Sequence, residues 1–305
     1  MGRNLARAPL FLALLLAACS SKSEPPASEP PFDPTNPGDG GGGFGPAAGD
    51  AGARSQCAES TKLIYVVSEE NTLYSFTPET ATFKSIGLLR CDTGGASPTS
   101  MAVDREGYAW VRHSDASLWR VSTQDASCTS TKYAPGQQGI FQFGMGFATE
   151  TSGSVNERLF IADSDGSGLG QLDLATMKLT RVGEFDGALQ GRTAELTGTG
   201  EGKLYGFFVT TPAQIAEISK GTGQIKSAKE LPGVNPGNAW AFAFYGGDFY
   251  IFTSAPTSGP PLAGGGSDVR RYRPSTGAVE LVKQKIGFKI VGAGVSTCAP
   301  TTSPR

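Results

Sequence analysis

Short apolar runs alternate with polar turns through most of the chain. Residues 63–67 and 108–111 are examples, and the turns between such runs are rich in Gly, Asp, Ser and Thr. Runs of this length, bounded by turn residues, predict β-strands rather than helices. We therefore expect an all-β domain over this part of the chain.

One apolar and polar pattern occurs five times. Each copy has an apolar strand end, a turn with Thr or Asp at the fifth place, and a new apolar strand start. The copies begin at Phe76, Val121, Leu172, Ile218 and Tyr272, at spacings of 45, 51, 46 and 54 residues. A repeat of this length with four short strands is typical of a β-propeller blade.

A further strand of small and apolar residues precedes most copies, at residues 100–103, 144–148, 194–197 and 240–244. The first copy lacks this strand, and residues 291–296 form one with no copy after it. Circular closure explains both facts, because closed rings protect the edges of their sheets. The prediction is a five-bladed β-propeller over residues 57–300, with the C-terminal strand closing blade one and 301–305 as a tail.

The closure of the ring also predicts how the cysteines pair. The chain has five cysteines, and Cys19 belongs to the predicted N-terminal export signal, which leaves four. An even number of cysteines in an exported chain predicts disulfides, and four cysteines allow three connectivities. Cys298 follows the last inner strand and Cys57 precedes the first blade, whereas Cys91 and Cys128 lie on outer strands of neighbouring blades. We therefore predict the pairs Cys57–Cys298 and Cys91–Cys128; free buried thiols are the alternative.

The N-terminus has the features of an export signal. Arg3 and Arg7 precede the apolar residues 10–18, a stretch too short to span a membrane. The junction at residues 16–19, Leu-Ala-Ala-Cys, resembles the lipobox of bacterial lipoproteins. This resemblance implies a signal peptide over 1–18, a lipid on Cys19 and, because Ser20 is not aspartate, the outer membrane. An ordinary cleavage site with an incidental cysteine is the alternative.

Residues 19–56 are rich in Pro and Gly and contain no aliphatic residue other than Ala. Such a segment cannot bury enough apolar surface to offset the entropy of ordering. We expect a disordered tether between the lipid and the propeller.

Composition narrows the functional classes. The chain has 42 glycines in 305 residues, a formal net charge of −2 and one histidine. Such a charge gives no support for nucleic-acid binding, which usually requires a strongly basic domain. A single histidine also disfavours most Ser-His-Asp and histidine-based metal sites.

Residues 103–110, Val-Asp-Arg-Glu-Gly-Tyr-Ala-Trp, resemble the D-x-x-G-x-x-W hairpin of NHL, gluconolactonase-like and virginiamycin-B-lyase-like propellers. The resemblance is specific in this one hairpin, and it implies the β-propeller fold. Gluconolactonase-like enzymes hold a central metal with carboxylate and amide oxygens. Glu195 with Asn235 or Asn238 could imitate this set and bind a cation such as Ca²⁺ in the channel. We favour the other interpretation, in which Glu195 is an isolated acid on an inner strand and contacts water in the channel.

Two further segments have the composition of a site. His113 beside Asp115 is a candidate acid and base pair, although a lone histidine in a hairpin loop is expected to be solvated. Asp163 begins a segment that resembles a calcium loop, but position twelve is Leu174 rather than the required glutamate. We expect a polar hairpin turn there.

These observations predict a lipid-anchored β-propeller of the cell envelope that binds or scaffolds without catalysis. Its expected partners are the membrane, through the lipid, and an envelope protein or small molecule. No catalytic residue, metal or cofactor is assigned. The alternative is a metal-dependent lactonase-like hydrolase or lyase that acts at the central funnel.

Overall fold

The computed structural model describes Cys57, residues 59–254 and residues 265–303. The predicted signal peptide, Cys19 and the Pro/Gly-rich segment lie outside the described residues. Helix is limited to three short 3-10 segments, η1 (Glu59–Lys62), η2 (Gln137–Gly139) and η3 (Gly187–Leu189). No helix in the described part of the chain has the length and apolar character of a membrane span.

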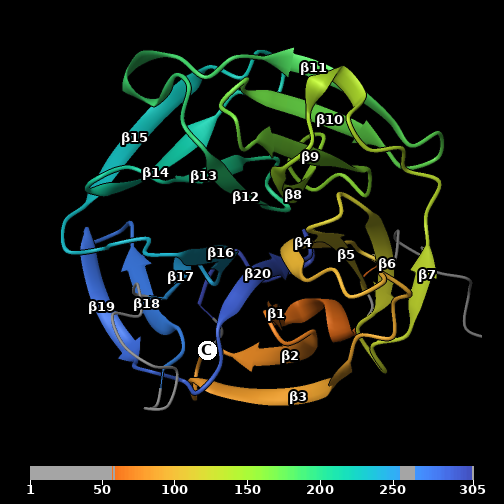
Figure 1. Ribbon diagram of the computed structural model, residues 1–305. Coiled ribbons are helices and arrows are strands. Elements are labelled where there is room, and N and C mark those ends of the chain that lie inside the picture. The colour runs from red at the N-terminus through yellow and green to blue at the C-terminus, as the bar shows by residue number, and fades with distance from the viewer. Residues whose placement is uncertain (1–56, 58, 255–264, 304–305) are drawn as a thin grey trace, which may run out of the picture. The chain divides into compact units, whose positions relative to one another are not determined.

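The strands form five antiparallel sheets of four strands, which are the blades of a propeller (Figure 1). Blade 1 contains β20 (Ile290–Val295), β1 (Ile64–Ser68), β2 (Thr72–Thr77) and β3 (Thr82–Leu88). Blade 2 contains β4 (Pro98–Val103), β5 (Tyr108–His113), β6 (Leu118–Ser122) and β7 (Cys128–Ser130). Blade 3 contains β8 (Phe143–Thr149), β9 (Glu157–Asp163), β10 (Leu169–Asp173) and β11 (Lys178–Gly183). Blade 4 contains β12 (Ala194–Gly198), β13 (Leu204–Phe208), β14 (Ala213–Ile218) and β15 (Ile225–Leu231). Blade 5 contains β16 (Ala239–Tyr245), β17 (Asp248–Ser254), β18 (Asp268–Arg273) and β19 (Ala278–Lys283).

The C-terminal strand closes the ring as predicted. β20 pairs with β1 in antiparallel register, with Ile64 opposite Val295 and Val67 opposite Gly292. It therefore becomes the innermost strand of blade 1, and Figure 1 shows it near the centre of the ring, between the inner strands β4 and β16 of the neighbouring blades.

Glycine on the inner strands permits the close approach of neighbouring blades. A Cβ on Gly146 of β8 would lie 2.7 Å from the carbonyl carbon of Leu196 on β12. A Cβ on Gly294 of β20 would lie 2.9 Å from the carbonyl carbon of Ala102 on β4. Real Cβ atoms do not approach backbone so closely, so the small residues predicted for these strands are a packing requirement of a narrow five-bladed axis.

The hydrophobic core is divided among the contacts between blades. The described residues form five clusters, and each cluster joins two adjacent blades. At the contact between blades 1 and 5, the rings of Phe76 and Phe252 meet edge to face with centroids 5.7 Å apart. This aromatic contact stabilises the junction at which the first and last blades meet.

Both predicted cysteine pairs are disulfide-bonded. The Cα atoms are 5.8 Å apart in Cys57–Cys298 and 5.0 Å apart in Cys91–Cys128. The first bond joins the residue ahead of blade 1 to the residue that follows its inner strand. The second joins Cys91, near the start of the loop between β3 and β4, to Cys128 at the start of β7, and therefore links blades 1 and 2.

Candidate functional site

A cavity of about 470 Å³ opens on the face where the inner strands begin, which we call the cavity face. Its hydroxyl and amide groups belong to Ser97, Thr99, Gln142, Ser164, Thr193 and Asn238. Two aromatic side chains, Phe143 and Trp240, and three carboxyl groups, Glu69, Asp165 and Glu195, also line it. Its volume is within the range of small-molecule sites.

Glu195 lies at the propeller axis, where its side chain joins blade 4 to blade 2. The Ser100 hydroxyl on β4 donates a hydrogen bond of 2.8 Å to Oε2 of Glu195 on β12. The inner strand between them is β8, and a Cβ on its Gly144 would lie 3.0 Å from Cδ of Glu195. The Glu195 side chain therefore reaches past β8 to β4, and it passes β8 at Gly144, where a larger side chain would be in its way.

Burial makes Glu195 a neutral carboxylic acid at neutral pH. The residue is 7% exposed, and this burial raises its pKa from 4.5 to about 8. Hydrogen bonds from Ser100 and the Met145 amide, and the charge of Arg112, lower the pKa by less. A neutral acid at the cavity floor is a hydrogen-bond donor as well as an acceptor.

Arg112 on β5 is a fully buried cation close to the cavity wall. Nη1 donates to Oγ1 of Thr99 at 2.6 Å and to Oε1 of Gln142 at 2.7 Å, and Nη2 donates to the Phe141 carbonyl at 2.5 Å. Its guanidinium also lies over the Phe143 ring, 5.3 Å from the centroid. Burial lowers its pKa to about 10, so the guanidinium stays charged at neutral pH.

The acceptors of Arg112 are neutral groups, and among the described residues no carboxylate lies within ion-pair distance of it. A buried charge is costly unless hydrogen bonds replace its hydration. The positions of Thr99 and Gln142 are therefore fixed by the need to solvate Arg112, and both residues line the cavity.

The expectation that His113 is solvated was wrong. The residue is completely buried, and within the described structure neither ring nitrogen has a hydrogen-bond partner. β5 continues through His113, which pairs with Pro98 on β4, so the side chain lies between blades rather than in the following turn. Burial lowers its pKa, which keeps the imidazole neutral.

The structure separates the candidate cation ligands. Glu195 and Asn238 line the cavity, whereas Asn235 lines a different hollow beside Pro212 and accepts a hydrogen bond from the Gly237 amide at 2.9 Å. Within the described part of the chain, no three His, Cys, Asp or Glu side chains are grouped as metal ligands.

The segment that resembles a calcium loop is a polar hairpin turn between β9 and β10. The buried carboxylate of Asp163 accepts hydrogen bonds from the amides of Asp165 and Ser167 at 3.3 Å and 3.0 Å. The Ser167 hydroxyl also donates to it. These contacts satisfy the carboxylate within the turn.

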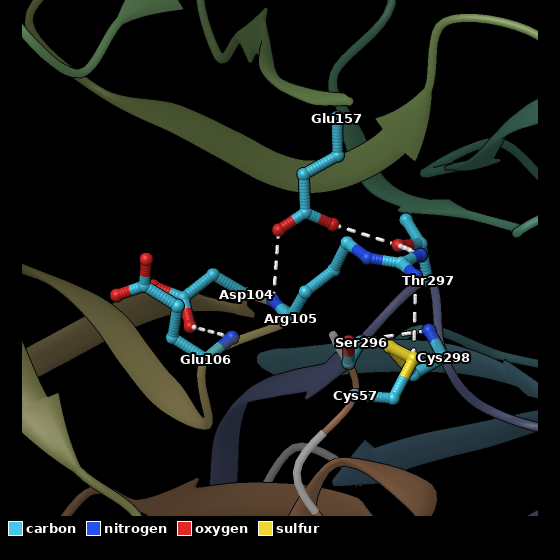
Figure 2. The surroundings of a disulfide bond; sticks show 8 residues. All are labelled: Cys57, Asp104, Arg105, Glu106, Glu157, Ser296, Thr297 and Cys298. Atoms are coloured by element: carbon cyan, nitrogen blue, oxygen red, sulfur yellow. Dashed lines mark hydrogen bonds between the residues drawn. A yellow bond between two sulfur atoms is a disulfide. The ribbon is translucent and has the colours of Figure 1, made fainter. Parts of the chain in front are cut away.

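The inner strands end on the opposite face of the propeller, which we call the disulfide face. A second cavity of about 540 Å³ opens there. Figure 2 shows the side chains between the disulfide and this cavity. Glu157 accepts hydrogen bonds from the Arg105 amide at 2.8 Å and the Thr297 hydroxyl at 2.7 Å. The Arg105 guanidinium donates to Thr297 and, at 3.3 Å, to Sγ of Cys57. Burial raises the pKa of Glu157 to about 7, and the cluster fixes the Cys57–Cys298 bond to blades 2 and 3.

We expect Glu195→Gln to flatten the dependence of stability on pH. The folded-state pKa of Glu195 lies above the ordinary value of 4.5, so its contribution is full below pH 4.5 and is lost as the pH rises to about 8. The wild-type protein should lose on the order of 3 kcal/mol of unfolding free energy through this group between about pH 5 and about pH 8. Glutamine does not ionise and should remove that loss, which chemical denaturation at both pH values measures.

Glu157 changes stability with the same sign, because burial also raises its pKa. It is present in both proteins, so its contribution cancels when the two pH dependences are subtracted. Equal pH dependences for the wild type and Glu195→Gln would contradict the assignment of Glu195 as a buried neutral acid.

Sequence patterns indicated Glu195 and Asn238 but did not indicate Arg112, Thr99 or Gln142. The sequence contained one signal: Arg112 is a charged residue that directly follows the apolar residues Ala-Trp-Val of β5, in a strand that is buried after its first residue. The partners of such a residue lie on other strands and loops, and a periodicity cannot identify them.

No protein-family model matches the chain, and no curated protein is significantly similar to it. The chain is similar to solved structures at low identity. One is a chain from the crystal structure of a nidogen/laminin complex, with 10% identity, a TM-score of 0.48, and coverage of 76% of this chain and 97% of that chain. Another is a luciferin-regenerating enzyme, with 16% identity, a TM-score of 0.41, and coverage of 65% and 68%. A third is a protein of unknown function from Bacteroides caccae, with 13% identity, a TM-score of 0.39, and coverage of 76% and 97%.

Proposed function

We propose that this protein is an exported lipoprotein whose propeller binds a ligand at the cavity face without catalysing a reaction. The observation that carries the proposal is the position of the cavity relative to Cys57. Cys57 is bonded to Cys298 after the last inner strand, on the disulfide face, whereas the cavity opens where the inner strands begin.

This geometry fits a membrane-anchored receptor. The chain reaches the propeller through Cys57, and 57 − 19 = 38 positions separate this residue from the lipidation candidate Cys19. Cys57 lies on the disulfide face, and the cavity opens on the opposite face, so a lipid on Cys19 would be joined through the chain to the face that does not hold the cavity. Two disulfides are also typical of proteins that fold in an oxidising compartment.

The cavity itself supports binding. It combines two aromatic side chains with several oriented hydroxyl and amide groups, which is the usual composition of a small-molecule site. Two of its polar side chains, Glu195 and Gln142, are held in position by hydrogen bonds from Ser100 and Arg112. Preorganisation of this kind lowers the cost of binding.

Expression in a Gram-negative host tests the anchor. We expect the wild-type protein to lose residues 1–18, to carry acyl chains on Cys19 and to sediment with the outer membrane, because more than one acyl chain makes membrane binding stable. Cys19→Ser should not be acylated and should leave the outer-membrane fraction. Intact-mass measurement and membrane fractionation give both results.

Ser20→Asp is the matched variant for the choice of membrane, since it keeps Cys19 and adds the residue that resemblance to lipoproteins associates with inner-membrane retention. It should be acylated but recovered with the inner membrane. A wild-type protein cleaved without acylation would contradict the anchor. Turnover of lactones by the wild type that is lost in Glu195→Gln would contradict the non-catalytic function.

A further inference from the structure

We propose that the cavity face binds a neutral, hydroxyl-rich ligand, which by size and chemistry is a monosaccharide or disaccharide. This inference rests on the binding function proposed above and names its ligand class. It follows from three properties of the cavity: the orientation of its polar groups, the charge of its walls, and its aromatic side chains.

Gln142 presents a hydrogen-bond donor to the cavity. Its Oε1 accepts from Arg112, and a guanidinium has donors only, so the amide cannot be reversed without placing its NH₂ group against another donor. The residue is exposed and lines the cavity. Its Nε2 therefore remains as a fixed donor for a ligand.

Two threonines on the same wall present acceptors. The Thr99 hydroxyl donates to the Arg112 carbonyl at 3.2 Å, and the Thr193 hydroxyl donates to the Ser164 carbonyl at 2.6 Å. A hydroxyl has one donor and two acceptor lone pairs. Thr99 already accepts from Nη1 of Arg112 and retains one lone pair, whereas no hydrogen bond to Oγ1 of Thr193 is seen among the described residues. The wall thus combines a fixed donor with fixed acceptors. A ligand hydroxyl, which donates and accepts at once, matches this combination.

The cavity lining, as far as the structure describes it, offers no cationic side chain to an anionic ligand, and its buried carboxyl group, Glu195, is neutral. No described residue that lines the cavity is Lys or Arg. Glu69 is neutralised at the mouth by Lys289, with 2.7 Å between Nζ and Oε2, and Asp165 is exposed to water. Glu195 at the floor is a neutral acid, because burial raises its pKa to about 8. An ion that left water for this cavity would find no compensating charge at the floor.

The aromatic groups complete the match. Phe143 is buried against the Arg112 guanidinium, and Trp240 at the start of β16 is half-buried. Of the two, Trp240 has the partly exposed ring surface and the polar N–H edge that can pack against the apolar face of a sugar ring while the sugar hydroxyls reach the polar wall. The volume of about 470 Å³ suits a ligand of one or two rings.

Ligand-observed saturation-transfer NMR on the full chain tests the proposal. The neutral probes are glucose, galactose, mannose, N-acetylglucosamine, lactose and cellobiose; the charged probes are glucosamine and glucuronate, which share the glucose framework. We expect signals from one or more neutral sugars and weaker or absent signals from the charged pair. Titration of the strongest neutral probe then gives its Kd.

Gln142→Glu is the decisive variant, because it keeps the size of the side chain and the contact with Arg112 but replaces the NH₂ donor by an acceptor. The Kd of the neutral probe should rise about tenfold, which corresponds to the loss of one good hydrogen bond. Gln124→Glu makes the same change in charge at an exposed position in the turn after β6, away from the cavity lining, and should leave the Kd unchanged.

The outcomes separate the ligand class from the binding function. Signals from glucuronate or glucosamine alone that disappear in Gln142→Glu would overturn the neutral ligand and retain a binding cavity. The absence of a saturation-transfer signal from every neutral probe would also overturn the inference. So would a Kd that Gln142→Glu and Gln124→Glu change equally. Sugar or lactone turnover that requires Glu195 would overturn the proposed non-catalytic function instead.

Discussion

Replacing Cys57 and Cys298 together by alanine should lower the free energy of unfolding by about 2–5 kcal/mol. The two cysteines are 241 positions apart, and their bond joins the two ends of the propeller. A cross-link restricts the unfolded chain more when it closes a longer loop, so its removal gives the unfolded state a large gain in entropy. Urea denaturation of the oxidised proteins measures the loss.

The double variant Cys91→Ala/Cys128→Ala is the matched comparison. These cysteines are 37 positions apart, so loop entropy predicts a loss smaller by about 1.5 kcal/mol than for the first pair. A larger loss of unfolding free energy for Cys91→Ala/Cys128→Ala than for Cys57→Ala/Cys298→Ala would contradict this prediction. It would show that the contact between blades 1 and 5, with Phe76 against Phe252, holds the ring together without the bond between its ends.

Gly144→Ala should destabilise the propeller by about 3 kcal/mol or more, at the upper end of the range for overpacking. The new Cβ would lie 2.7 Å from the Cα of Glu195 and closer still to the carbonyl oxygen of Ala194. Both contacts are with backbone, so relief requires β8 and β12 to move apart at the axis. The same movement would lengthen the hydrogen bond from Ser100 to Glu195. Chemical denaturation measures the effect.

Gly221→Ala is the control, because a Cβ there would meet no atom within 4 Å and the backbone has no positive φ. It should change stability by no more than about 0.5 kcal/mol. Adding Glu195→Ala to Gly144→Ala should not restore stability, since the closest contacts are with backbone rather than with the glutamate side chain. Restoration would show that the crowding at the axis comes from the carboxylate.

Local sequence patterns were sufficient for the architecture. The fivefold repeat predicted four strands per blade, and the missing first inner strand predicted that residues 291–296 close blade 1. The disulfide pairs followed from that closure and are confirmed. These predictions succeeded because blades form from neighbouring segments, so turn chemistry and alternation encode most of the strand pairing.

The site was predicted only in part. Glu195 and Asn238 were identified as residues near the axis, and both line the cavity. Asn235 was grouped with them because it is near in sequence, but it faces a different hollow beside Pro212. His113 was expected in a solvated turn, but β5 continues two residues beyond the predicted run 108–111, and His113 at its end is completely buried.

The number of blades, the closing strand and the cysteine pairs could be predicted from the amino-acid sequence, because each depends on the order of short elements along the chain. The groups that the cavity presents to a ligand could not be predicted without the three-dimensional arrangement of the blades. Arg112 fixes Gln142 from a position 30 residues away, and Ser100 bonds Glu195 across 95 residues. Such contacts depend on the radius of the ring and the direction of each side chain. The protonation of Glu195 likewise depends on its burial at the axis, which no local pattern encodes.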